Sequence, residues 1–150
     1  FQWMRWPSFD EAAWGRLLKG ADGDVLDRCP PIIGSDRDAG AVAATAVNAT
    51  NAHVAANVAV EQAPVSDLSL PVTKGWIVTN PPYGARVGGP DVRDLYDRTG
   101  AVLRERAPGW HLALLASAET PVQRLGLPLE RVLDTTNGGI KVGVHTAVVP

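Results

Sequence analysis

Two consecutive prolines end the apolar run Trp76 to Val78, and this arrangement restricts the fold more than any other feature of the sequence. Proline lacks a backbone N–H and disfavours the helical conformation in the residue before it. A strand over 75–79 must therefore stop at Pro81 and Pro82. We predict a short buried strand that leads into a rigid, extended polar loop, Thr79 to Gly84.

The polar side chains of this loop are candidate functional groups. Ligands of open parallel sheets bind at the carboxyl ends of the strands, and this is where the sequence places the amide of Asn80 and the ring of Tyr83. The alternative interpretation is a tight surface loop that Gly84 closes.

The rest of the chain alternates between helix-like and strand-like patterns. A Ser-x-x-Glu capping box at Ser8 opens a helix that we predict to end near Gly20, and Asn137-Gly138-Gly139 offers a hairpin turn. Trp110 to Ala116 is an apolar run typical of a central strand covered on both faces. Helices are predicted at about 9–19, 38–50, 91–106 and 119–125, and strands at 32–36, 57–61, 75–79, 110–116, 129–135 and 140–149. This alternation predicts a doubly wound α/β sheet, mostly parallel, with an antiparallel hairpin at its C-terminal edge.

Composition restricts the compartment and the partners. With 150 residues and 45% apolar residues, a single domain is expected, and no apolar run approaches the roughly 18 residues of a membrane span. The lone Cys29 cannot form an intrachain disulfide or a multi-thiolate metal site, so we expect a cytoplasmic protein without a metal. The net charge of −2 has the wrong sign for a freestanding nucleic-acid binder. Any binding of nucleic acid is therefore expected to be local or to depend on another domain.

Asp36 is the last residue of the predicted strand 32–36 and precedes a predicted helix. In this arrangement a carboxylate at the end of a strand accepts hydrogen bonds from both ribose hydroxyls of a nucleotide-like cofactor. A solvated aspartate or a helix N-cap explains Asp36 equally well on its own. The cofactor interpretation gains weight from Asn80, which is expected at the end of a later strand of the same sheet.

These motifs resemble the class I S-adenosylmethionine-dependent methyltransferases that act on exocyclic amines. The segment Trp76 to Arg86, then Asp94-Leu95-Tyr96 and the closing Thr136 to Ile140 are most similar to the THUMP-associated RNA guanine-N2 methyltransferases, which include large-subunit ribosomal RNA enzymes. The resemblance extends from the first predicted helix to the last strand. It implies a Rossmann-like sheet, S-adenosylmethionine as cofactor and RNA, most directly ribosomal RNA, as partner.

The resemblance also assigns roles to the loop residues. An exocyclic amine is a poor nucleophile because its lone pair is delocalised into the ring, so acceptors must draw on its N–H bonds. By resemblance these acceptors are the side-chain oxygen of Asn80, which also faces the cofactor, and the backbone carbonyl of Pro81. The prolines, Pro82 included, fix both acceptors in advance, and the ring of Tyr83 stacks on the extruded base. By the same resemblance, Gly84 and Arg86 are the remaining candidate residues for binding the substrate.

Two departures from the family pattern concern the cofactor side. The glycine-rich loop after the first strand has no counterpart here, because Gly34 and Gly88-Gly89 stand in the wrong places. That strand and loop are expected immediately before Phe1, which is not an initiator methionine, so the 150 residues alone should be nearly inactive. In the family an acidic residue contacts the adenine amine of the cofactor. The motif does not identify that residue here, and among the residues from Glu61 onward we choose Asp67.

Other interpretations stay open at this stage. The Asn-Pro-Pro-Tyr motif also occurs in enzymes that methylate adenine or cytosine in DNA, or glutamine in proteins. The fragment could also be a catalytically silent Rossmann-like scaffold. The arginines that follow the motif are interleaved with acidic residues, so a solvated helical face with salt bridges is the preferred account of Arg93, Arg98, Arg104 and Arg106.

Overall fold

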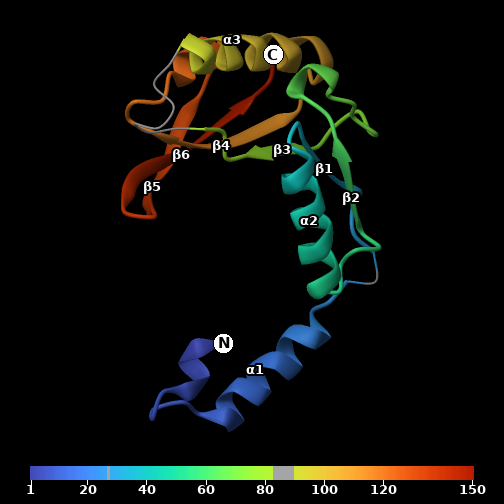
Figure 1. Cartoon of the computed structure of the whole chain (residues 1–150), viewed down its shortest axis with the longest axis vertical. Coiled ribbons are helices and arrows are strands. Elements are labelled where there is room, and N and C mark those ends of the chain that lie inside the picture. Colours follow the sequence, from blue (N-terminus) through green and yellow to red (C-terminus); the bar gives the residue numbers. More distant parts are fainter. Residues whose placement is uncertain (27, 83–89) are drawn as a thin grey trace. The chain divides into compact units, whose positions relative to one another are not determined.

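The computed structural model describes residues 1–26, 28–82 and 90–150 (Figure 1). The chain divides into two compact units, Phe1–Ile32 and Ile33–Pro150, and each is described by itself. None of the helices in the described ranges is long and apolar enough to cross a membrane.

The N-terminal unit is a small aromatic cluster followed by a helix. A 3₁₀ turn, η1 (Gln2–Arg5), precedes α1 (Glu11–Gly23), and the rings of Trp3 and Trp14 meet edge to face at 4.8 Å. Phe1 and Phe9 also contact this pair.

Both predicted ends of the first helix are wrong. The N-cap is Asp10 instead of Ser8, and its carboxylate accepts a hydrogen bond from Ala13 N at 2.8 Å. Asp10 is as good a cap as serine and lies directly before the first turn, whereas Ser8 is two residues too early. The helix also continues through Gly20 to Gly23, because an exposed glycine weakens a helix by about 1 kcal/mol without ending it.

The second unit begins with a β-α-β segment: β1 (Ile32–Asp36), α2 (Ala39–Asn51) and β2 (Val58–Gln62). The two strands form their own two-stranded sheet, with α2 beside it (Figure 1). Asp38 caps α2 by accepting from Ala41 N at 2.8 Å. The three elements lie within one residue of their predicted positions, but β1 is not buried, since Ile32 and Ile33 are 50% and 45% exposed.

A four-stranded sheet forms the rest of the unit. Its strands are β3 (Trp76–Thr79), β4 (His111–Ser117), β6 (Ile140–Val148) and β5 (Glu130–Asn137), in that order. β3 and β4 are parallel, and β6 runs antiparallel to both of its neighbours. The predicted hairpin turn is confirmed, with φ of 56° at Gly138 and 84° at Gly139. The single predicted sheet is thus divided in two.

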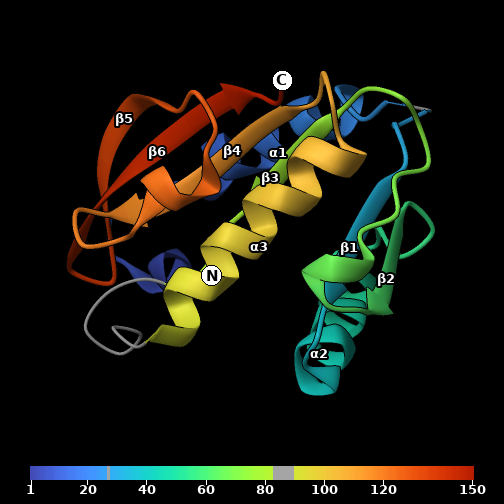
Figure 2. The same ribbon diagram turned by 90° about the horizontal axis from the view of Figure 1, so that it is seen from above.

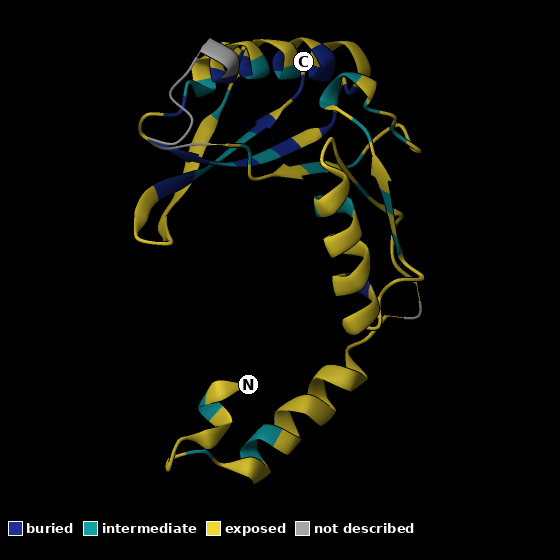
Figure 3. Ribbon diagram, viewed as in Figure 1, coloured by how far each residue is buried: buried dark blue, intermediate teal, exposed yellow. Residues whose placement is uncertain are grey.

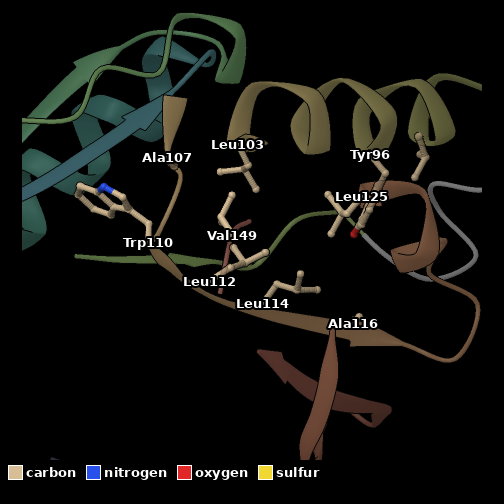
Figure 4. Packing of buried hydrophobic residues seen from close by; sticks show 10 residues of the cluster. Tyr96, Leu103, Ala107, Trp110, Leu112, Leu114, Ala116, Leu125 and Val149 are labelled. Carbon is tan, nitrogen blue, oxygen red and sulfur yellow. The ribbon is translucent and has the colours of Figure 1, made fainter. Parts of the chain in front are cut away.

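Helix α3 (Pro90–Arg106) covers one face of the four-stranded sheet (Figure 2). Two 3₁₀ turns, η2 (Val65–Asp67) and η4 (Val122–Leu125), pack against α3. Figure 3 shows buried residues gathered on α3, β4 and β6. The core residues between these elements include Tyr96, Leu103, Leu112, Leu114, Leu125 and Val149 (Figure 4).

The structure corrects two predictions of burial. In β4 the core positions Leu112 and Leu114 are buried, while His111 on the other face is exposed, so β4 is not covered on both faces. In β3, Trp76 and Val78 are 60% and 78% exposed. Within the described residues, α3 and the two short turns that pack against it cover one face of this sheet. The apolar residues of the other face stay exposed, and Trp76 stacks there on His111 with ring centroids 4.6 Å apart.

Candidate functional site

The asparagine-proline loop lies at the carboxyl end of β3, as the sequence predicts. The last pair in the β3–β4 register is Thr79 with Leu114, and Asn80 follows as an exposed residue outside the strand. Pro81 is partly buried and Pro82 is exposed. The amide of Asn80 is therefore open to a ligand at the same edge of the sheet as the end of β4.

A buried tyrosine contacts the backbone of this loop at Pro82. The hydroxyl of Tyr96, in α3, donates to the backbone carbonyl of Pro82 at 3.4 Å. Tyr96 is 2% exposed, and burial raises the pKa of its hydroxyl to about 12, so the group is a protonated donor at neutral pH. In the sequence, Tyr96 belongs to the Asp94-Leu95-Tyr96 segment of the family resemblance, and nothing there assigns it a contact with the loop. A contact across 14 residues has no signal in periodicity.

The turn η4 packs against α3 beside Tyr96. Gly100 makes this approach possible, because a Cβ there would lie 2.1 Å from the carbonyl oxygen of Leu125. Arg104 donates to the carbonyls of Leu125 and Gly126, and Arg124 pairs with Asp97. The solvated face predicted for α3 is therefore partly a docking face for η4.

Asp36 is the last residue of β1, as predicted, and two backbone N–H groups donate hydrogen bonds to it. One carboxylate oxygen accepts from Asp38 N at 2.8 Å, and the main-chain carbonyl accepts from Ala63 N at 3.0 Å. Because Asp38 caps α2, the alternative that Asp36 is the helix cap is excluded. The Asp36 side chain stays exposed.

The other acidic candidate is Asp67. It belongs to η2, accepts from Ser66 Oγ at 3.2 Å and lines an open hollow of about 720 Å³ with Arg106 and Trp110. Neither Asp36 nor Asn80 lines that hollow. Among the hydrogen bonds and ion pairs of the described ranges, none joins Asp36, Asp67 and Asn80 to one another.

The expectation that Asp36 and Asn80 end strands of the same sheet is wrong. β1 belongs to the two-stranded sheet and β3 to the four-stranded one. In the described part of the chain no strand pairs with both β1 and β3, so no backbone hydrogen bonds join the two sheets through a shared strand. Three further candidates, Tyr83, Gly84 and Arg86, lie outside the described residues.

Residues 4–144 match the UPF0020 family, described as an RMKL-like methyltransferase domain. The chain belongs to this family. The resemblance drawn from the asparagine-proline loop and the closing hairpin segment is thereby confirmed.

Two curated relatives of the RMKL-like chain are each 30% identical to it. A protein of Synechocystis sp. (strain ATCC 27184 / PCC 6803 / Kazusa), named as a candidate RNA methyltransferase, slr0064, aligns over 93% of this chain and 37% of its own length. The ribosomal RNA large subunit methyltransferase K/L of Shewanella sp. (strain ANA-3) aligns over 94% of this chain and 20% of its own length. The chain thus spans between a fifth and two fifths of these relatives.

A solved structure carries the same fold. SMU.472, named as a candidate methyltransferase and crystallised with SAH, superposes with a TM-score of 0.82 at 26% identity, over 100% of this chain and 40% of that one. The predicted fold class, an α/β methyltransferase sheet with an antiparallel C-terminal hairpin, is confirmed.

Proposed function

We propose that the protein transfers a methyl group from S-adenosylmethionine to the exocyclic N2 amine of guanine in RNA, most directly in ribosomal RNA. One observation carries the proposal: in a member of the RMKL-like methyltransferase family, Asn80 stands exposed at the end of β3, directly before two prolines. The relatives named for RNA and ribosomal RNA support the substrate class.

The loop supplies what amine methylation requires. The Asn80 side-chain oxygen and the Pro81 carbonyl accept the two N–H bonds of the amine, which returns its lone pair to the nitrogen for attack on the methyl group. Proline fixes φ, so these acceptors need little reorganisation during the reaction. The methylated amine is a cation and loses its proton to water or a carbonyl, so no strong general base is required.

S-adenosylmethionine supplies the electrophilic methyl group on a sulfonium, and SAH, found with SMU.472, is its demethylated form. In this chain Asp36 is proposed to accept hydrogen bonds from the ribose hydroxyls, since its exposed carboxylate is fixed at the end of β1. Asp67 is the proposed partner of the adenine amine, and Asn80 also faces the cofactor. The family's glycine-rich loop is not part of this sequence and would complete the site.

On the substrate side, Tyr83 is proposed to stack on the extruded guanine, with Gly84 beside it and Arg86 at a phosphate. Stacking on an aromatic ring is worth about 1–3 kcal/mol per base. Because the chain carries a net charge of −2, most of the affinity for RNA is expected from regions outside it.

The proposal is tested with the full-length gene product and S-adenosylmethionine labelled in its methyl group. Ribosomal RNA, transfer RNA and DNA are offered in parallel, and the modified nucleoside is identified by mass spectrometry. We expect N2-methylguanosine from RNA. Methylated adenine or cytosine from DNA would establish the alternative amino-methyltransferase, and an absence of both transfer and cofactor binding would indicate a silent scaffold.

Replacing Asp36 with asparagine is expected to weaken S-adenosylmethionine binding about tenfold or more, because a hydrogen bond to a charged acceptor contributes about 1.5–3 kcal/mol. Asparagine keeps an oxygen for Asp38 N, so the end of β1 should stay intact. Calorimetric titration measures the Kd. The matched control is Asp38→Asn, which retains a good helix cap and should leave the Kd unchanged. An unaltered Kd for Asp36→Asn would remove Asp36 from the cofactor site.

A further inference from the structure

We infer, on the basis of the proposed function, that Tyr96 is a positioning residue for methyl transfer. Its hydroxyl holds the Pro82 carbonyl and thereby keeps the acceptors of Asn80 and Pro81 aimed at the substrate amine. Nothing in the alternation of apolar residues along α3 distinguishes Tyr96 from its neighbours. The contact with the loop gives it this role.

The described part of the loop, Thr79 to Pro82, is held at both of its ends. At its start, the β3–β4 register fixes Thr79 against Leu114. At its end, the Tyr96 hydroxyl meets the carbonyl of Pro82. Proline rings lock φ at two of the three residues between these points, so few backbone rotations remain. A group that fixes the Pro82 carbonyl therefore also restricts the direction of the Pro81 carbonyl and of the Asn80 side chain.

Tyr96 can act as such an anchor because its own position is rigid. It is 2% exposed and lies beside Leu125, which is equally buried (Figure 4). The close approach of η4 at Gly100 and the bonds from Arg104 to the carbonyls of Leu125 and Gly126 keep this packing in place. The position of the hydroxyl is thus set by the core.

The distance of 3.4 Å is long for an O–H···O bond. Contacts of catalytic groups often tighten when the substrate complex forms, so this bond is expected to shorten when RNA is bound. A buried tyrosine hydroxyl normally has a partner, and the Pro82 carbonyl provides it. Because burial raises the pKa of Tyr96 to about 12, the hydroxyl remains a donor throughout the pH range of an assay.

Loss of this anchor should affect the transition state more than the ground state. The hydrogen bonds from the amine to the two acceptors strengthen as the amine becomes a cation. A misplacement of these acceptors by about 1 Å can lower the rate by about 10²-fold. Neither the cofactor carboxylate of Asp36 nor its backbone contacts involve Tyr96. We therefore expect kcat to fall while cofactor affinity stays the same.

The test is Tyr96→Phe in the full-length gene product, with kcat, KM for RNA, Kd for S-adenosylmethionine and Tm measured together. We expect kcat to fall about 10- to 100-fold at every pH from 6 to 9, with KM and Kd changed less than twofold. The matched control is Leu112→Val, which removes a similar amount of core packing on β4 away from the loop and should leave kcat unchanged.

The outcomes separate the two proposals. If the wild-type protein methylates RNA and Tyr96→Phe keeps at least half of its kcat, the positioning role is wrong and the proposed function stands. A loss of kcat as large in Leu112→Val means that stability explains the effect, and this also overturns the role. If the wild-type protein transfers no methyl group, both proposals fail.

Discussion

Asn80→Ala is expected to lower kcat for methyl transfer by about 10²–10³-fold, which is the cost of removing one preorganised group that stabilises developing charge. The side chain is exposed at the end of β3, so its loss should change the free energy of unfolding by less than about 0.5 kcal/mol. Single-turnover rates with saturating RNA and cofactor measure the chemical step directly. Because Asn80 is also proposed to face the cofactor, the Kd for S-adenosylmethionine is measured alongside.

The control for this variant is Asn57→Ala. Asn57 is also an exposed asparagine, but it lies before the amino end of β2. Asp36 and Asn80 lie at the carboxyl ends of their strands. Asn57→Ala should leave both rate and affinity unchanged. If Asn80→Ala retains wild-type single-turnover rates, the acceptor role of the loop is refuted, whatever happens to cofactor binding. A rise in Kd with an unchanged rate would restrict Asn80 to the cofactor side.

Local signals in the sequence predict most of the elements. Asp38 marks the start of α2 because its side chain can cap the helix, and Pro81 marks the end of β3 because it cannot continue a strand. The hairpin turn follows from two glycines that accept positive φ. Each signal depends on a few neighbouring residues, so it survives without knowledge of the tertiary structure.

Burial and partner strands are where the predictions were wrong. Trp76 and Val78 were predicted to be buried because they are apolar, but they are exposed. The residue type alone does not show whether another element packs against that face of the sheet. The ends of β1 and β3 are correctly placed as polar edges, but the sequence does not show that they belong to different sheets. Strand pairing depends on contacts between distant segments, which periodicity does not record.

The candidate site divides in the same way. Asp36 and Asn80 were chosen as candidates because Asp36 ends β1 and Asn80 directly follows β3. Tyr96 was missed as a partner of the loop because its contact depends on how α3 crosses the end of β3. Besides the resemblance of Asp94-Leu95-Tyr96, the available signal was a tyrosine, instead of a leucine or valine, inside a predicted helix, since a buried hydroxyl requires an acceptor.

Gly100→Ala is expected to destabilise the protein by about 3 kcal/mol, although alanine in a helix interior normally stabilises it by about 1 kcal/mol. The new Cβ would lie 2.1 Å from the Leu125 carbonyl oxygen and 2.7 Å from its Cα. These are backbone atoms, so the clash cannot be relieved by a side-chain rotation. The turn η4 would have to move, and Leu125, now 2% exposed, would lose its packing in the core. Urea unfolding gives the free energy and the m-value.

Gly20→Ala is the matched control, because Gly20 also lies inside a helix but has no atom within 4 Å of the new Cβ. It should be neutral or stabilise by up to about 1 kcal/mol. Equal stability of the two alanine variants would contradict the close contact between α3 and η4. If that contact exists, Gly100→Ala should also lower kcat, because displacing Leu125 frees Tyr96 and with it the Pro82 carbonyl. The absence of a side chain at Gly100 would then connect the packing of the core to the orientation of the acceptors in the asparagine-proline loop.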